Sequence, residues 1–395
     1  MVNKLRIGLL GRIVIAIITG VAVGLVAPEF VARLCATFNV IFGQFLGFLI
    51  PLIIVGFVSP AISDLGLRAG RMLVFTVVLA YAATLFAGFV SYFTGAWLFP
   101  SMLSHESAAT SLAESAASVA PYFTISIPAI MPVMTALVFA FLVGLGAACV
   151  KGSAVRRGLS EFRDIVALTI NKVVIPLLPV YIFGIFLNMT VEGQVGVILA
   201  TFAKIIAVIF VLHVLILLFQ FCVAACFNGK SPLRMLWTMM PAYFTALGTQ
   251  SSAATIPVTL RQSVRMGVSE DVAGFTVPLC ATIHMSGSTL KIVACALALM
   301  IMQGLPYDVG AFAQFIAMLG VTIIAAPGIP GGAIMASLGL LSTVLGFTDA
   351  QNAMMIALYI AMDSFGTACN VTGDGALSVI VDRFYGKKHD AGATN

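Results

Sequence analysis

The sequence has very little charge for its length. Only 9% of its 395 residues are Asp, Glu, Lys or Arg, whereas an ordinary soluble domain has about 25%. So few charges cannot cover the surface of a water-soluble fold of this size. The shortage excludes soluble enzymes, nucleic-acid-binding proteins and disordered proteins. The net charge of +5 does not indicate a nucleic-acid partner, because the basic residues lie between apolar runs rather than in a patch.

Cysteine is scarce as well. The seven cysteines are an odd number and lie in or at the edge of apolar runs, which is typical of small buried hydrophobic residues. Cys222 and Cys226 are four residues apart, but no nearby His or carboxylate completes a metal site. The N-terminal apolar stretch lacks a small-residue cleavage site, so we expect a first membrane helix rather than a signal peptide.

Long apolar runs are what the sequence has in abundance, and 61% of its residues are hydrophobic. Crossing about 30 Å of hydrocarbon takes a helix of roughly 20 residues. The sequence therefore predicts an all-α membrane protein with eight transmembrane helices. The expected spans are near 9–27, 39–60, 72–99, 124–149, 166–190, 195–227, 272–302 and 352–380.

Two further apolar regions are interrupted at their centres. Residues 232–262 surround the polar sequence TQSS at 249–252, and residues 311–347 are broken by PGIPGG at 327–332. Non-helical backbone at membrane depth is tolerated only where protein or a water-filled cavity buries it. We therefore predict two re-entrant helical hairpins. The first starts inside and the second starts outside, which makes an inverted repeat of the kind found at transporter binding sites.

Basic residues are unevenly distributed over the connecting segments. With a cytoplasmic N-terminus, most Lys and Arg residues face the cytoplasm and the external loops are acidic. This positive-inside pattern predicts that both termini are cytoplasmic. It also supports the first hairpin, because Lys230 and Arg234 would otherwise lie across the membrane from Arg261 and Arg265. We expect a multi-pass protein of the plasma membrane, in particular a bacterial inner membrane.

The last span carries a row of polar residues. Thr367, Asn370 and Asp374 follow Asp363 at offsets that place all four on one helical face. A carboxylate in hydrocarbon costs a few kcal/mol, so the row predicts a binding site. A seam of hydrogen bonds between packed helices is the alternative.

The preceding span contains the sequence TIHMSGS at 282–288. Gly287 and its small polar neighbours predict an unwound helix whose free carbonyls can coordinate a cation. His284 is a candidate proton carrier, and a purely structural buried histidine is an equal alternative. Lys291 can extend to the interface, pair with a carboxylate or act as a fixed cation, and the sequence does not choose between these roles.

These residues resemble the dicarboxylate/amino acid:cation symporters, a family that includes glutamate and neutral amino acid transporters. The most specific match is NVTGD at 370–374, followed by SSAATIP at 251–257 and GIPGGA at 328–333. The resemblance covers essentially the whole chain. It implies a homotrimer in which each protomer combines a static scaffold with a transport domain that moves like an elevator.

The resemblance also implies how the chain is divided. Residues 1–230 are expected to be mainly scaffold and trimerisation spans, with about 72–99 and 195–227 to be assigned in part to the transport domain. Residues 231–395 are expected to form the core transport domain. Its parts would be a hairpin at 231–263, a span at 271–302, a hairpin at 309–348 and a span at 352–384.

Binding roles follow from the same resemblance. Asp363 would bind the ammonium group of an amino acid, while Asn370 and the Ser251-Ser252 tip would hold its carboxylate. The other implied substrate-binding residues are Ser288, Ile329, Gly366 and Thr367. The implied ligands for one or two sodium ions are Cys280, Thr282, His284, Met285, Asn370 and Asp374, with carbonyls near 323–326.

The sequence departs from the family at the position of an arginine. Members with acidic substrates place this arginine three residues after the ammonium-binding Asp, where this chain has Gly366, and the alternative position is Gln250. A substrate side-chain carboxylate would be buried without its bidentate partner, at a cost of roughly 3–5 kcal/mol. This departure favours a small neutral amino acid such as serine, threonine or alanine.

A second departure concerns the coupled ions. The family motif Asn-Met-Asp-Gly-Thr reads HMSGS at 284–288, so the carboxylate of a third sodium site is missing and Na⁺ should bind poorly there. We predict fewer coupled sodium ions than in archaeal members. Proton coupling through His284 is a possible addition, and Lys291 could substitute for a bound cation.

The sequence thus predicts a symporter for a small neutral amino acid, coupled to Na⁺ with H⁺ as a possible second coupled ion, and no enzyme. One alternative is a carrier of acidic amino acids or dicarboxylates, in which Lys291 replaces the missing arginine. An ion channel is a second. An intramembrane hydrolase built on Ser286 or Ser288 with His284 is disfavoured, because the sequence shows no acid to orient the histidine and no nucleophile elbow.

Overall fold

The computed structural model describes residues 9–65, 71–103, 119–150, 152–193, 195–324 and 331–386, and every regular element in these ranges is a helix. The first half contains α1 (Leu9–Gly24), α2 (Glu29–Leu65), α3 (Arg71–Leu103), α5 (Val133–Cys149), α6 (Ala154–Thr169), the π-helical turn η2 (Ile170–Val174), α7 (Ile175–Val191) and α8 (Val195–Asn228). The second half contains α9 (Pro232–Thr249), α10 (Ser252–Arg265), α11 (Glu270–Ile283), α12 (Ser286–Met302), α13 (Val309–Ile324), α14 (Gly332–Val344), α15 (Asp349–Ala361) and α16 (Asp363–Tyr385).

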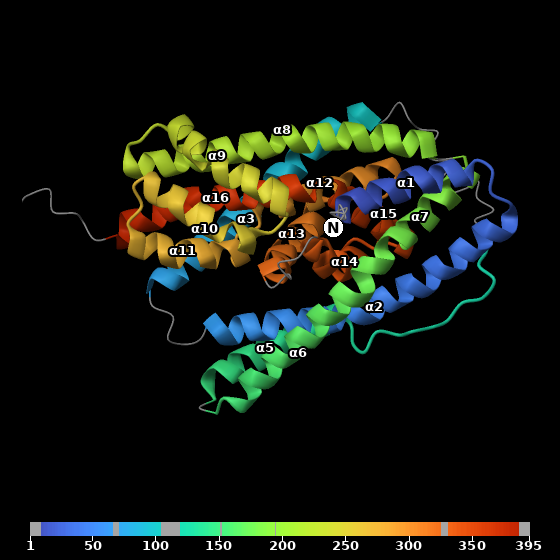
Figure 1. Cartoon of the computed structure of the whole chain (residues 1–395), viewed down its shortest axis with the longest axis horizontal. Coiled ribbons are helices and arrows are strands. Elements are labelled where there is room, and N and C mark those ends of the chain that lie inside the picture. Colours follow the sequence, from blue (N-terminus) through green and yellow to red (C-terminus); the bar gives the residue numbers. More distant parts are fainter. Residues whose placement is uncertain are drawn as a thin grey trace, which may run out of the picture.

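Helix α12 lies at the centre of the molecule, and every residue from Ser286 to Met300 is buried. It contacts α3, α8, α15 and α16. Ser91 of α3 donates from Oγ to the carbonyl of Leu290 at 2.7 Å, and Tyr81 donates to a carbonyl of α13. These bonds fasten α3 to the C-terminal half of the chain, while α8 runs along α16 (Figure 1).

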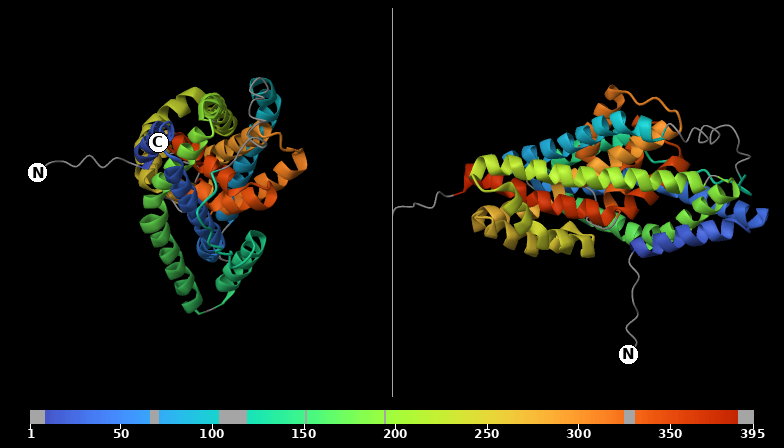
Figure 2. Two further views of the ribbon diagram at one scale, coloured as in Figure 1. Left: turned by 90° about the vertical axis from the view of Figure 1, so that its right-hand side faces the viewer. Right: turned by 90° about the horizontal axis from the view of Figure 1, so that it is seen from above.

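A second group of helices lies on the other side of the molecule. Helix α2 packs against α5, α6 and α7, and α1 packs against α7. Figure 2 shows α5 and α6 as an outer pair that projects from the rest. The two groups meet where α2 contacts α14 and α1 contacts α15.

The outer helices expose large apolar side chains. Trp97 of α3 is 80% exposed and Trp237 of α9 is 78% exposed, an arrangement that suits lipid better than water. Among the described residues, five helical segments are long and apolar enough to cross a membrane, or six if α15 and α16, bent by 62°, form one span. The molecule is therefore a multi-pass membrane protein.

The predicted count of eight spans is not confirmed. Helices α1 and α5 have 16 and 17 residues, fewer than the roughly 20 needed for a full crossing. The predicted span 124–149 is wrong over its first residues, because α5 begins only at Val133. Pro128 and Pro132 explain the late start, since proline and the residue before it disfavour helix.

Helices α9 and α10 are packed against each other as a hairpin. Lys230, before α9, donates to the carbonyl of Met266, just after α10. The chain therefore enters and leaves this hairpin at the same end. Helices α13 and α14 also pack together, and the residues between them include 325–330, which lie outside the described residues. How deeply either pair enters a bilayer stays a prediction.

Candidate functional site

Two helix breaks meet in the interior. Between α11 and α12 the backbone is extended at His284, with φ −95° and ψ 107°, and α15 and α16 are bent at Met362. Gly287 allows the broken helix to press against α16, because a Cβ there would lie 2.6 Å from Cβ of Cys369 and 2.7 Å from the carbonyl oxygen of Gly366. The predicted unwinding at 282–288 is thus confirmed, and it is confined to two residues.

The buried carboxylate of Asp374 faces His284. Nδ1 of His284 lies 2.9 Å from Oδ1 of Asp374, and both side chains are buried. On the other edge of the ring, Nε2 lies 3.3 Å from Nε2 of Gln220. An amide nitrogen can only donate, so the ring accepts at Nε2 and carries its proton at Nδ1, toward Asp374. This pair can hold or pass a proton.

The expectation that no acid orients His284 is wrong, because Asp374 does so across 90 residues of sequence. This pair does not restore the hydrolase alternative. The edge of the ring away from Asp374 faces Gln220, and Gln220 also donates to Oγ of Ser286 at 3.2 Å. A serine hydroxyl must contact the histidine to be activated as a nucleophile, and here Gln220 takes that place on the ring.

The other buried carboxylate, Asp363, is paired with Lys291. Nζ of Lys291 lies 3.0 Å from Oδ1 of Asp363, and the second oxygen accepts the backbone N–H of Gly331 at 2.7 Å. The ammonium also lies 3.4 Å from the ring centroid of Tyr359. Of the roles that the sequence left open for Lys291, the structure selects pairing with a carboxylate.

Gly366, at the position of the missing arginine, lies against this lysine. A Cβ on Gly366 would lie 2.7 Å from Nζ, 2.8 Å from Cε and 3.2 Å from Cδ of Lys291. The lysine stem therefore occupies space beside the helix that any larger residue at 366 would need. Thr367, one residue on, is buried.

Asn370 binds the start of α12. Its Oδ1 accepts the backbone N–H groups of Gly287 and Ser288 at 2.8 and 3.3 Å, and its Nδ2 donates to Oγ of Ser288 at 3.0 Å. Tyr359 donates to the same hydroxyl at 3.2 Å. The side chain thus satisfies N–H groups that a helix start leaves without partners. Binding of substrate or sodium by Asn370 or Ser288 stays a prediction.

The tip of the first hairpin reaches the same region. Gln250 has φ of +54°, a left-handed conformation that a residue with a Cβ rarely adopts, and its Nε2 donates to Oγ of Ser364 at 2.9 Å. Ser251 caps α10 by accepting the N–H of Ala254, and Ser252 is the first residue of α10. The tip is thus joined to the residue that follows Asp363.

Comparison with known proteins agrees with this architecture. Residues 9–384 match the model of the sodium:dicarboxylate symporter family. The chain belongs to that family. It is therefore a transporter rather than an enzyme, and it is a sodium-coupled symporter of the multi-pass type. It is also similar to the serine/threonine transporter SstT of Acinetobacter baumannii, with 26% identity over 393 residues, 95% of this chain and 97% of the relative.

Within this symporter, only some of the expected sodium ligands lie together in the interior. The carbonyl of Cys280 accepts the N–H of His284 at 2.8 Å and so ends α11. The hydroxyl of Thr282 donates to the carbonyl of Leu279 on an exposed part of the helix, whereas Met285 is buried. The ligand set stays a prediction. The substrate residue Ile329 and the carbonyls at 325–326 lie outside the described residues.

Three residues of the symporter's interior were missed by the sequence reasoning. Gln220 and His213 project from α8 toward the break, and Nε2 of His213 lies 3.1 Å from the carbonyl oxygen of Gly287. Tyr359 covers the Lys291 ammonium. A signal for the first two was present, since these polar residues, seven positions apart on one helical face, interrupt a run at 205–227 whose other residues are apolar.

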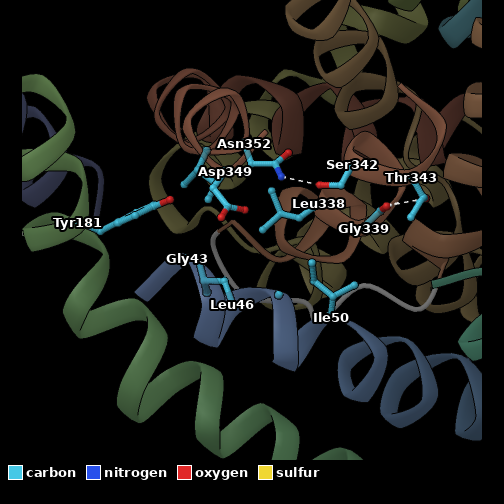
Figure 3. Close-up of a pocket in the computed structure, with 12 residues that line it drawn as sticks. Gly43, Leu46, Ile50, Tyr181, Leu338, Gly339, Ser342, Thr343, Asp349 and Asn352 are labelled. Atoms are coloured by element: carbon cyan, nitrogen blue, oxygen red, sulfur yellow. Dashed lines mark hydrogen bonds between the residues drawn. The ribbon is translucent and has the colours of Figure 1, made fainter. Parts of the chain in front are cut away.

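A cavity of about 180 Å³ lies apart from these pairs, between α2 and the second half of the chain (Figure 3). Gly43 and Ile50 of α2, Tyr181 of α7 and Asp349 at the start of α15 line it. Asn352 donates to Ser342 at its edge. The cavity marks the boundary between the two groups of helices and contains neither buried ion pair.

Proposed function

We propose that this symporter takes up a small neutral amino acid, such as serine, threonine or alanine, with Na⁺ and with a proton carried by His284. The charge balance of the site carries the proposal. Asp363 and Asp374 each have a basic partner within 3.0 Å, and the cation beside Gly366 is Lys291, whose charge Asp363 already balances. A zwitterion with an uncharged side chain adds no net charge to the Lys291–Asp363 pair, whereas an acidic substrate would add one uncompensated negative charge in a buried site.

In this mechanism Asp363 binds the substrate ammonium, and Asn370 with the Ser251-Ser252 tip binds the carboxylate. The N–H of Gly331 on Asp363 supports closure of the second hairpin over the site. The transport domain, residues 231–395 with α3 and α8, then slides as an elevator within a homotrimer in a bacterial inner membrane. The fastening of α3 to α12 supports its inclusion in the moving part.

Uptake into proteoliposomes tests the function. Purified protein is reconstituted, and uptake of labelled serine, threonine and alanine is measured under an inward Na⁺ gradient, an inward H⁺ gradient, and both. We expect saturable uptake that requires Na⁺ and increases with the proton gradient. If neither gradient drives uptake of any neutral amino acid, the proposed substrate class is wrong.

A second candidate is transport of an acidic amino acid or dicarboxylate. The position of the Lys291 stem against Gly366 favours it, because Nζ lies 2.7 Å from where a Cβ at 366 would be and so brings a positive charge to the place of the missing side chain. Competition separates the two candidates. Excess unlabelled aspartate or succinate should leave serine uptake unchanged under the first candidate and abolish it under the second.

A further inference from the structure

Lys291 is a charged side chain in α12, in which every residue from Ser286 to Met300 is buried. Its relative exposure is 0%, and its ammonium has three neighbours. These are Oδ1 of Asp363 at 3.0 Å, the carbonyl oxygen of Met362 at 3.4 Å and the ring of Tyr359, 3.4 Å from its centroid. A side chain that extended to the interface would leave its charge in water. This one is instead held inside a built site.

The ammonium of Lys291 has the same chemistry as the group that Asp363 is proposed to bind. Both are primary ammonium ions with one positive charge and three donors. Oδ1 of Asp363 is taken by Lys291 at 3.0 Å, and Oδ2 is taken by the N–H of Gly331 at 2.7 Å. A substrate ammonium that joined Lys291 on this carboxylate would place two positive charges against one negative charge in a buried site, which is costly unless one of the ammonium ions moves away.

We propose that Lys291 is a tethered substitute for the substrate ammonium. It occupies Asp363 in the substrate-free protein, and the substrate binds by displacing it. This inference rests on the proposed function, because it assumes a substrate that carries an amine. It adds that the chain itself supplies a competitor for its own binding site.

The surroundings of Lys291 contain groups that can receive the displaced ammonium. Gly366 has no side chain, so no Cβ at that position holds the lysine stem where it is. The ring of Tyr359 offers the displaced ammonium a cation–π contact. The carbonyl of Met362, at the bend between α15 and α16, offers an acceptor. The charge can thus leave Asp363 without entering bare hydrocarbon.

The consequence concerns the empty carrier. With Lys291 on Asp363, the charge of the carboxylate is balanced from within the chain, and its second oxygen accepts the N–H of Gly331. A transport domain without substrate can therefore return across the membrane without an unpaired buried charge. The protein would then catalyse net transport rather than obligatory exchange. The apparent substrate affinity would be lower than the intrinsic one, because the substrate can bind only during the fraction of time in which the lysine does not hold the site.

The test compares Lys291→Met with Lys172→Met. Methionine keeps the length and removes the charge, and Lys172 is an exposed lysine in another span. Binding of labelled serine is measured on purified protein, and serine efflux is measured from proteoliposomes into buffer with and without external serine. For Lys291→Met we expect serine to bind about tenfold tighter, the factor for a site held nine-tenths of the time. Net efflux should fall far below exchange, and Lys172→Met should match the wild type.

Unchanged or weaker serine binding by a folded Lys291→Met variant would overturn the inference. If that variant does not fold, Lys291→Arg takes its place. A guanidinium pairs with a carboxylate in a bidentate manner, so this variant should bind serine more weakly, and equal or tighter binding overturns the inference. Wild-type protein that binds no amino acid overturns the proposed function as well. If the wild type transports serine but the Lys291 variant gives the contrary result, only the inference about Lys291 is overturned and the proposed function stands.

Discussion

Asp363 and Asp374 lie on one face of one helix, yet they have different surroundings. Asp363 is at the start of α16, beside the bend and the hairpin residue Gly331, and its partner is a lysine. Asp374 is three turns further on, its partner is a histidine, and Gln220 of α8 lies behind that histidine. The first carboxylate borders the hairpin residue Gly331 and the bend before α16, and the second is enclosed by helices. We therefore propose that the first binds substrate and that the second serves the ions.

Among the substitutions that test this difference between the two carboxylates, Asp363→Asn should have the largest effect, a loss of serine binding. It removes the charge that the substrate ammonium needs and leaves Lys291 buried without a counter-ion. Loss of one partner of a buried pair costs roughly 3–5 kcal/mol, or about two to four decades of serine affinity. Binding of labelled serine to purified protein measures this. Any binding of succinate, which has no amine, should survive the substitution, and wild-type serine affinity in the variant would contradict the assignment.

His284→Asn should have a smaller effect, confined to the coupling of uptake to the ions. The substitution introduces the residue of the family motif and removes the imidazole from Asp374. We expect proton-driven uptake to fall at least about tenfold, equivalent to ~1.4 kcal/mol, while serine affinity at saturating Na⁺ stays close to that of the wild type. Uptake under separate Na⁺ and H⁺ gradients gives the result.

The control for that experiment is His284→Asn combined with Ser286→Asp, which restores the missing carboxylate. This double variant should depend more steeply on Na⁺ than His284→Asn alone, because a carboxylate is a preferred ligand for a hard cation. Unaltered proton dependence in both variants would show that the His284–Asp374 pair is only structural.

Two glycine substitutions should have the smallest effect on ion and substrate preference, because they act on stability, and they distinguish packing from binding. Alanine at Gly287 meets the backbone oxygen of Gly366 and Cβ of Cys369, neither of which can move away, so we expect a loss of about 1–3 kcal/mol of stability. Alanine at Gly366 meets the flexible end of Lys291 and should cost less. Thermal unfolding in detergent compares the two. Equal losses would show that Lys291 is as rigid as the backbone around Gly287.

Much of the site could be predicted from the sequence because its signals are local. The offsets of Thr367, Asn370 and Asp374 from Asp363 depend only on the helical period, and all four are buried on α16. The break before Gly287 was likewise visible in a short run of small polar residues. Hydropathy alone places the start of the span 124–149 too early, because Pro128 and Pro132 disfavour helix before Val133.

By itself, the sequence determined the membrane class, the family and the face of α16 that carries the carboxylates. Composition, periodicity and motif spacing need no knowledge of what packs against what. Only the tertiary structure decided which group each carboxylate meets. Lys291 is 72 residues from Asp363, and Gln220 is 64 residues from His284. Such pairs depend on how α8, α12 and α16 pack, and no local pattern in the chain encodes that packing.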